Sequence, residues 1–216
     1  MESGHDDWTF GGLWPYEARW FDTLDGRMHY IDEGPRGGRP VVLIHGNPTW
    51  GFLYRHFIAP LTADGHRIIV PDLLGFGRSD KPPRTELYRI DAHIRRLDAL
   101  LESLELSSAV VVPQDWGGPI GLSWAVAHPD RVSALFILNT FAHQPPGRVS
   151  LMPALHLVRA PGVGEVLVNG LGLFHRVFLF RAGVVHQERL TTAVKRAYLA
   201  PQSNDQNLWM SLGEAA

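Results

Sequence analysis

Short apolar runs alternate with helical patterns along the first 140 residues of the chain. Four of these runs resemble strands buried on both faces of a parallel sheet: residues 40–44, 67–70, 109–112 and 134–138. Before them, residues 19–24 and 28–32 predict a hairpin around the turn Asp25-Gly26. The helical patterns cover residues 50–61, 90–104 and 116–128. This repetition of strand and helix predicts an α/β fold with a mostly parallel, doubly wound sheet.

The character of the sequence changes after about Phe141. Prolines follow one another closely at positions 145, 146, 153 and 161, and no further clear sheet strand is evident up to Ala216. We therefore predict an α/β core over residues 1–141 and a helical cap subdomain over residues 142–216. The alternative is that the later helices continue a single domain.

The composition excludes several classes of function. Hydrophobic residues make up 45% of the chain and charged residues 19%, which is ordinary for a globular protein. The net charge of −2 and the lack of a basic stripe give no reason to expect a nucleic-acid partner. The absence of cysteine excludes disulfides, thiolate catalysis and cysteine-ligated zinc. The glycine-rich residues 72–82 lack the lysine spacing of a P-loop, and we expect no cofactor and no metal.

Neither the N-terminal segment nor the later apolar stretch has the pattern of a membrane segment. Residues 1–7 are polar and acidic, without the basic start and apolar core of a signal peptide. Residues 163–180 are the most apolar late stretch, but they contain Glu165, His175 and Arg176, which a lipid-spanning helix would bury at high cost. We therefore expect a soluble, cytoplasmic protein with no membrane partner.

One acidic residue, Asp115, stands where the apolar run 109–112 meets the helix predicted to follow it. A tight strand-to-helix turn with small residues at Gly117 and Gly118 is typical of a nucleophile elbow, and a helix N-terminus favours a carboxylate anion. A carboxylate can displace a leaving group from saturated carbon and form an ester that water then cleaves, whereas serine would leave an ether. Asp115 is therefore a candidate covalent nucleophile. The alternative is a plain N-cap aspartate.

A second turn, His45-Gly46-Asn47, follows the apolar run 40–44. It resembles the oxyanion-hole loop of the α/β hydrolases, and the backbone N–H groups of Asn47 and Trp116 would then face the ester carbonyl oxygen. The two side chains are also hydrogen-bond donors, because an indole N–H donates once and an amide NH₂ donates twice.

Gln114-Asp115-Trp116-Gly117-Gly118, taken together with the segment His-Gly-Asn-Pro-Thr-Trp at residues 45–50, resembles the haloalkane dehalogenases of the α/β-hydrolase fold. The similarity extends over essentially the whole chain in the order and spacing of its motifs. In that family, the tryptophan after the nucleophile and the asparagine after His-Gly hold the leaving halide, and Trp116 and Asn47 occupy these positions. The resemblance implies hydrolysis of a small haloalkane to an alcohol and a halide through a covalent alkyl-aspartate ester.

Two other functions remain open. Epoxide hydrolases share the aspartate elbow, but they usually carry phenylalanine at the position of Asn47 and use two cap tyrosines. After residue 141 this chain has a single tyrosine, Tyr198. The alternative of another class is an inactive α/β-hydrolase-like protein, because none of the eleven histidines follows a last sheet strand, where the mechanism needs its base.

The family resemblance also implies sheet strands that the sequence does not contain. The turn Leu138-Asn139-Thr140 carries no carboxylate, which resembles the subfamily with an Asn/Trp halide pair and a late catalytic aspartate. We therefore expect the last strands, the catalytic histidine and the acid to lie beyond residue 216, and the chain to be a fragment that cannot turn over. If this expectation is wrong, the histidines to re-examine are those of the predicted cap, at positions 143, 156, 175 and 186.

Overall fold

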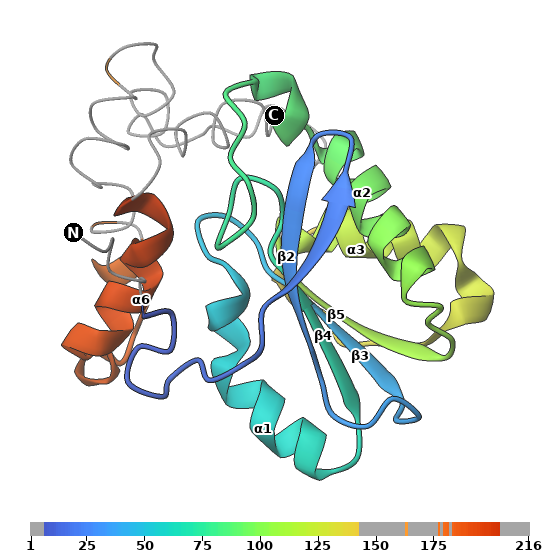
Figure 1. Cartoon of the computed structure of the whole chain (residues 1–216), viewed down its shortest axis with the longest axis horizontal. Helices are drawn as coiled ribbons and strands as arrows, with labels where there is room; N and C mark the ends of the chain where they lie inside the picture. Colours follow the sequence, from blue (N-terminus) through green and yellow to red (C-terminus); the bar gives the residue numbers. More distant parts are fainter. Residues whose placement is uncertain (1–6, 143–162, 164–176, 178, 182, 204–216) are drawn as a thin grey trace, which may run out of the picture.

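The computed structural model describes residues 7–142, 163, 177, 179–181 and 183–203 (Figure 1). Its centre is a seven-stranded sheet in the order β1-β2-β4-β3-β5-β6, with β7 paired to β5. The strands are β1 (Arg19–Thr23), β2 (Gly26–Glu33), β3 (Pro40–Ile44), β4 (Arg67–Pro71), β5 (Ala109–Asp115), β6 (Val132–Leu135) and β7 (Leu138–Thr140). The β1–β2 and β2–β4 pairs are antiparallel, and the other pairs are parallel. The predicted α/β class with a mostly parallel sheet is confirmed.

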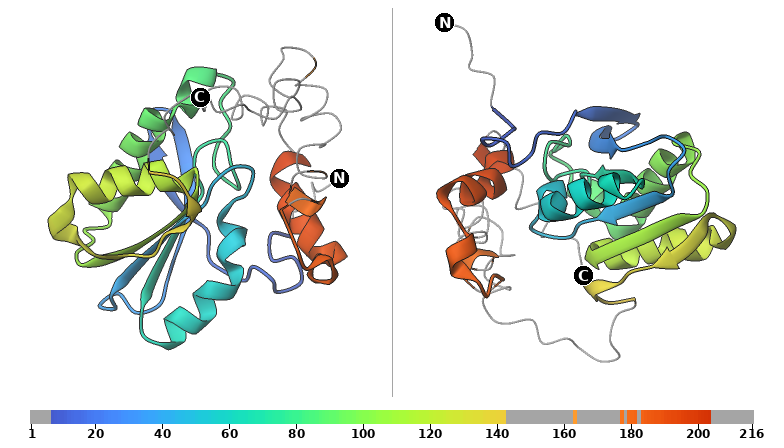
Figure 2. Two further views of the ribbon diagram at one scale, coloured as in Figure 1. Left: turned by 180° about the vertical axis from the view of Figure 1, so that it is seen from behind. Right: turned by 90° about the horizontal axis from the view of Figure 1, so that it is seen from below.

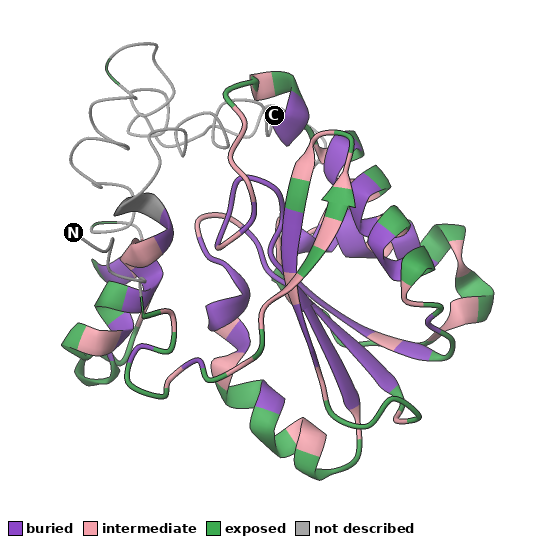
Figure 3. Ribbon diagram, viewed as in Figure 1, coloured by how far each residue is buried: buried purple, intermediate pink, exposed green. Residues whose placement is uncertain are grey.

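Helices cover both faces of the sheet (Figure 1). On one face, Ile58 of α1 packs in the same buried cluster as Leu43 of β3. On the other face, Leu97 of α2 and Trp124 of α3 pack with Ile44 of β3. Up to residue 142, the α-helices are α1 (Arg55–Ala63), α2 (Ile90–Ser103) and α3 (Gly117–Ala127), and the short 3-10 helices are η1 (Gly51–Tyr54), η2 (Thr85–Tyr88) and η3 (Pro129–Arg131). Because alternate side chains of a central strand point to opposite faces, both sets must be apolar, as the continuous runs predicted (Figure 3).

The fourth apolar run departs from the prediction of a single buried strand. Residues 134–138 divide between β6 and β7, with a register shift in the pairing to β5 between Gln114 and Asp115. Leu135, Phe136 and Ile137 are exposed by 45%, 59% and 55%. β6 is the edge strand in the described part of the chain, so no neighbouring strand covers these side chains there.

One helix of the predicted cap lies within the described residues. α6 (Thr192–Ser203), preceded by the 3-10 turn η6 (Gln187–Arg189), lies beside the N-terminal segment (Figure 2). Its Val194 and Ala197 join the buried cluster on the α1 face of the sheet, together with Phe10 and Trp14. The indole Nε1–H of Trp50 donates to the carbonyl oxygen of Ala197 at 3.1 Å. Most of residues 142–216 lie outside the described residues, so the cap boundary near residue 142 stays a prediction.

None of the helices in the described part of the chain combines the length and the apolar character that crossing a bilayer would require.

Candidate active site

Asp115 is the last residue of β5, and α3 begins two residues later at Gly117. Its φ of +51° lies in the left-handed region, which a non-glycine residue rarely adopts. The following glycines let the helix start against its neighbours. A Cβ at Gly117 would lie 2.3 Å from the carbonyl oxygen of Ile44, and a Cβ at Gly118 would lie 1.7 Å from Oγ1 of Thr140. The local backbone is therefore a sharp strand-to-helix elbow with Asp115 at its centre.

The structure brings Asp115, Asn47 and Trp116 together, the three residues that the sequence singled out. Oδ1 of Asp115 accepts the backbone N–H of Asn47 at 3.0 Å and that of Trp116 at 2.7 Å. Oδ2 of Asp115 has no hydrogen-bond partner among the described residues. The close approach of the loop after β3 to the Asp115 carboxylate requires glycine at position 46, because a Cβ there would lie 2.3 Å from Oδ1 of Asp115. One carboxylate oxygen is thus held by two amides, and the other keeps its lone pairs available.

Burial raises the pKa of Asp115, and this effect outweighs the backbone N–H groups of Trp116 and Asn47, which lower it. The sequence led us to expect that the helix N-terminus would favour the anion. The two amides do favour it, but the desolvation of a largely enclosed carboxyl is the larger influence. Asp115 is therefore a weakly solvated carboxylate rather than one stabilised by many donors.

The peptide group between Gly46 and Asn47 is held from its carbonyl side. The Gly46 oxygen accepts the N–H of Thr49 at 2.9 Å, the Thr49 hydroxyl at 3.0 Å and Nδ1–H of His45 at 3.0 Å. In a trans peptide the C=O and the N–H point in opposite directions, so three donors on the oxygen direct the Asn47 N–H toward Asp115. The far end of the loop is also anchored, because the N–H of Gly51 donates to the buried carboxylate of Asp72 at 2.8 Å.

His45 is a structural member of this loop and not a base. Its Nε2 accepts the backbone N–H of Leu73 at 3.0 Å, so the ring must be neutral and must carry its proton on Nδ1. The ring is fully buried, and burial lowers its pKa. Sequence analysis assigned His45 to the oxyanion loop but missed the contributions of Thr49 and Leu73, because these contacts depend on the folded loop.

No histidine among the described residues hydrogen-bonds to Asp115. His29 pairs with Asp72 at 2.8 Å, and His128 pairs with Asp98 at 2.7 Å. His186 is exposed and contacts Glu188 at 3.0 Å. The other three histidines of the predicted cap, at positions 143, 156 and 175, lie outside the described residues.

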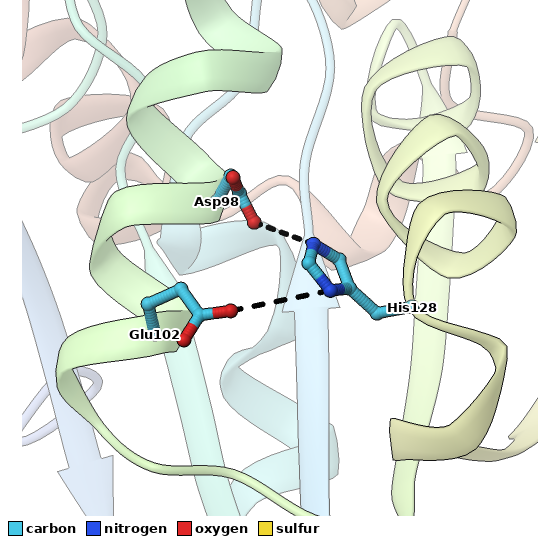
Figure 4. A group of neighbouring side chains, drawn as sticks. All are labelled: Asp98, Glu102 and His128. Carbon is cyan, nitrogen blue, oxygen red and sulfur yellow. Dashed lines mark hydrogen bonds and ion pairs between the residues drawn. The ribbon is translucent and has the colours of Figure 1, made fainter.

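Asp98 and Glu102 of α2 face His128 at the end of α3 (Figure 4). The ring presents Nε2 to Asp98 at 2.7 Å and Nδ1 to Glu102 at 3.9 Å, so one metal ion could not use both contacts. Arg131 also holds Glu102 at 2.9 Å. The group is an ion-pair network that joins α2 to α3, at the opposite end of α3 from Asp115.

Comparisons with known proteins agree with the observed fold. Residues 39–168 match the family described as the alpha/beta hydrolase fold. The chain is 45% identical over 181 residues to a haloalkane dehalogenase of Mycobacterium marinum, covering 83% of this chain and 57% of that protein. It is 39% identical over 191 residues to a cis-3-alkyl-4-alkyloxetan-2-one decarboxylase of Shewanella oneidensis, covering 88% of this chain and 58% of that one.

Among solved structures, the tetrameric haloalkane dehalogenase DpaA of Paraglaciecola agarilytica superposes with a TM-score of 0.72 at 32% identity, covering 93% of this chain and 64% of that one. The chain therefore belongs to the α/β-hydrolase fold family, and proteins named haloalkane dehalogenases are among its curated and structural relatives. It spans between about half and two thirds of the length of the curated relatives that it matches, from 46% to 64%.

Proposed function

We propose that the protein containing this chain hydrolyses haloalkanes to an alcohol and a halide through a covalent ester at Asp115. The observation that carries the proposal is the asymmetry of the Asp115 carboxylate. Oδ1 is held by the N–H groups of Asn47 and Trp116, whereas Oδ2 has no described partner. Similarity to haloalkane dehalogenases supports the same activity.

In the first step, Oδ2 of Asp115 attacks the carbon that bears the halogen. A carbon–oxygen bond forms as the carbon–halogen bond breaks, and its electron pair leaves with the halide. The side-chain amide of Asn47 and the indole of Trp116 donate hydrogen bonds to the developing halide. The product of this step is an alkyl ester of Asp115 with Oδ1 as its carbonyl oxygen.

In the second step, water attacks the carboxyl carbon of the ester. Negative charge then develops on Oδ1, which already accepts the Asn47 and Trp116 amides at 3.0 and 2.7 Å. Collapse of this intermediate releases the alcohol and restores the carboxylate. We propose that a histidine outside the described residues takes a proton from the water and returns it to the departing alkoxide oxygen. The new carboxyl group of Asp115 then loses its remaining proton to solvent.

Tyr198 favours dehalogenation over epoxide hydrolysis. Its hydroxyl accepts a hydrogen bond from Arg55 at 3.2 Å, and its ring packs against Phe52 with centroids 5.2 Å apart. The side chain lies in the buried cluster beside α1, where burial raises its pKa. The one tyrosine that sequence analysis identified as a possible epoxide acid is thus engaged in packing.

A second candidate reaction comes from the relative in Shewanella oneidensis. In an oxetan-2-one, attack of Asp115 on the saturated carbon bonded to the ring oxygen would break that carbon–oxygen bond and leave a β-carboxylate. Loss of CO₂ from this carboxylate would then form an alkene and expel Asp115 as its carboxylate. Release of CO₂ from a cis-3,4-dialkyl oxetan-2-one, without halide release from haloalkanes, would favour this reaction over dehalogenation.

The test is halide release from short bromoalkanes by the complete protein, compared with Asp115→Ala. Asp64→Ala serves as the matched control, because Asp64 is an exposed aspartate at the end of α1. We expect Asp115→Ala to abolish release and Asp64→Ala to preserve it. Equal release by the wild type and Asp115→Ala would refute the proposal, and no release by a folded wild type would favour the inactive alternative.

A further inference from the structure

The side-chain oxygen of Asn47 needs a hydrogen-bond partner that the described residues do not supply. Oδ1 of Asn47 is buried and has no hydrogen-bond partner in the described part of the chain. A buried amide oxygen is normally satisfied by protein or by ordered water. What binds Oδ1 also decides where the NH₂ group points, because the two ends of a planar amide are fixed relative to each other. That NH₂ group is the proposed halide donor.

Asn47 lines a small cavity together with His93 of α2 and Trp116 of the elbow. The remaining wall is apolar or aromatic and comes from residues 73, 76, 88, 90 and 120. The cavity has a volume of about 20 Å³. A single water molecule needs about 10–15 Å³ and two or more polar partners. The cavity is thus large enough for one water.

Hydrogen bonding determines the protonation of His93. Nδ1 of His93 lies 3.2 Å from Nη2 of Arg96, and a guanidinium can only donate. Nδ1 therefore carries a lone pair, and the neutral ring carries its proton on Nε2. Arg96 is itself fixed by Asp25 at 2.7 Å. Burial, followed by the charge of Arg96, lowers the pKa of His93 well below its ordinary value.

We propose that one water molecule in this cavity accepts Nε2–H of His93 and donates to Oδ1 of Asn47, so that His93 is a positioning residue for the halide donor. The inference rests on the proposed function. A water fits better than a halide in this cavity, because the lone pairs of Oδ1 repel an anion, whereas water both accepts and donates. With Oδ1 held in this way, the NH₂ group of Asn47 is turned toward the leaving group.

Two substitutions of His93 separate this role from simple packing. His93→Asn can keep an acceptor near Nδ1 for Arg96 but loses the Nε2 donor. His93→Gln places an amide donor near Nε2 but loses the acceptor for Arg96. We expect His93→Asn to weaken bromide binding by the complete protein about 3- to 10-fold, the effect of one neutral hydrogen bond. His93→Gln should rescue most of this affinity.

Bromide affinity is measured by saturable quenching of tryptophan fluorescence at constant ionic strength. The chain has seven tryptophans, and several could contribute to the fluorescence. The quenching that is lost in Trp116→Phe therefore identifies the part of the signal that comes from the proposed halide site. Tyr88→Phe is the matched control, because Tyr88 lines the same cavity but donates its hydroxyl to the carbonyl oxygen of Pro82 at 2.7 Å. His93→Asn should also have no further effect in an Asn47→Ala background, where the group that it positions is gone.

The possible outcomes distinguish the inference from the function. Halide release with unchanged bromide affinity in His93→Asn would overturn the inference and leave the function intact. If His93→Gln alone loses bromide affinity, His93 acts as an anchor for Arg96, and the inference is overturned. If both variants lose bromide affinity equally, His93 serves packing, and the inference is likewise overturned. A wild type that neither binds bromide nor releases halide would overturn both. In crystals soaked with bromide, an anomalous signal inside the cavity would refute the assignment to water.

Discussion

The backbone N–H of Asn47 donates to Oδ1 of Asp115 at 3.0 Å, although the two residues are 68 positions apart in the sequence. This bond joins the loop after β3 to the elbow after β5, and the two strands are parallel neighbours in the sheet. Parallel neighbours end at the same edge of a sheet, so the two turns meet there. The relationship places the proposed nucleophile and an amide donor together without any contact that local sequence could specify.

The side chains of Asn47 and Trp116 should each be needed for halide displacement. Asn47→Ala and Trp116→Phe each remove a donor from a water-poor site, which typically costs about 2–4 kcal/mol, or about 10²–10³ in rate. Pre-steady-state halide release from a bromoalkane measures the effect on the first step. If both variants keep full activity and lose only thermal stability, the two side chains serve packing.

Gly46→Ala should inactivate the enzyme while leaving the fold largely intact. A Cβ at this position would lie 2.3 Å from Oδ1 of Asp115 and 2.6 Å from the backbone nitrogen of Trp116, so the loop must move away from the elbow. We expect activity to fall at least about 10²-fold, as for the loss of an oxyanion donor. Gly37→Ala is the control, because a Cβ there meets no atom within 4 Å. Similar activity in the two variants would contradict the assigned geometry.

Thr49→Val should slow hydrolysis of the ester more than its formation. The Thr49 hydroxyl is one of three donors that orient the Gly46 carbonyl, and the opposite end of the same peptide group is the Asn47 N–H. Loss of one neutral hydrogen bond corresponds to about a 2- to 10-fold effect. Rapid-quench kinetics should show an unchanged burst of halide and a slower steady state. Thr62→Val, which removes a similar hydroxyl-to-carbonyl bond within α1, should change neither phase.

The partly buried carboxyl group of Asp115 should reduce stability at neutral pH. Because its pKa is raised above 3.8, the folded state binds the proton more tightly than the unfolded state does. The unfavourable contribution of the carboxylate is therefore fully present above the folded pKa. It disappears as the pH falls through the folded pKa toward 3.8. Asp115→Asn should have a higher free energy of unfolding than the wild type at pH 7, with the difference shrinking as the pH is lowered. Denaturant unfolding at several pH values tests this, and a constant difference would contradict it.

A polypeptide consisting of residues 1–216 alone should be alkylated once and should not turn over. Its described part contains the nucleophile and both amide donors, but no histidine that hydrogen-bonds to Asp115. After incubation with a bromoalkane, mass spectrometry should find one added alkyl group on Asp115, and Asp115→Asn should acquire none. Sustained turnover would show that a base was overlooked and would direct attention to the three cap histidines outside the described residues.

The sequence by itself determined the central strands, the three helices that pack on them and the elbow. A strand buried on both faces must be apolar at every position, and such runs are visible at residues 40–44, 67–70 and 109–112 without any knowledge of neighbours. Residues 134–138 have the same apolar pattern, but they divide between two strands and lie at the edge of the described sheet, which apolar composition does not reveal.

The tertiary structure alone decided how the site is held together. The orientation of the Gly46–Asn47 peptide depends on donors from His45 and Thr49, and the tautomer of His45 depends on Leu73, 28 residues away. The pKa of Asp115 is raised because the surrounding elements enclose it, although a helix N-terminus taken alone predicts the opposite. The cavity that His93 shares with Asn47 likewise exists only where α2 meets the loop after β3. Each of these features is a balance between groups distant in the chain, and local residue patterns carry no information about distances between such groups.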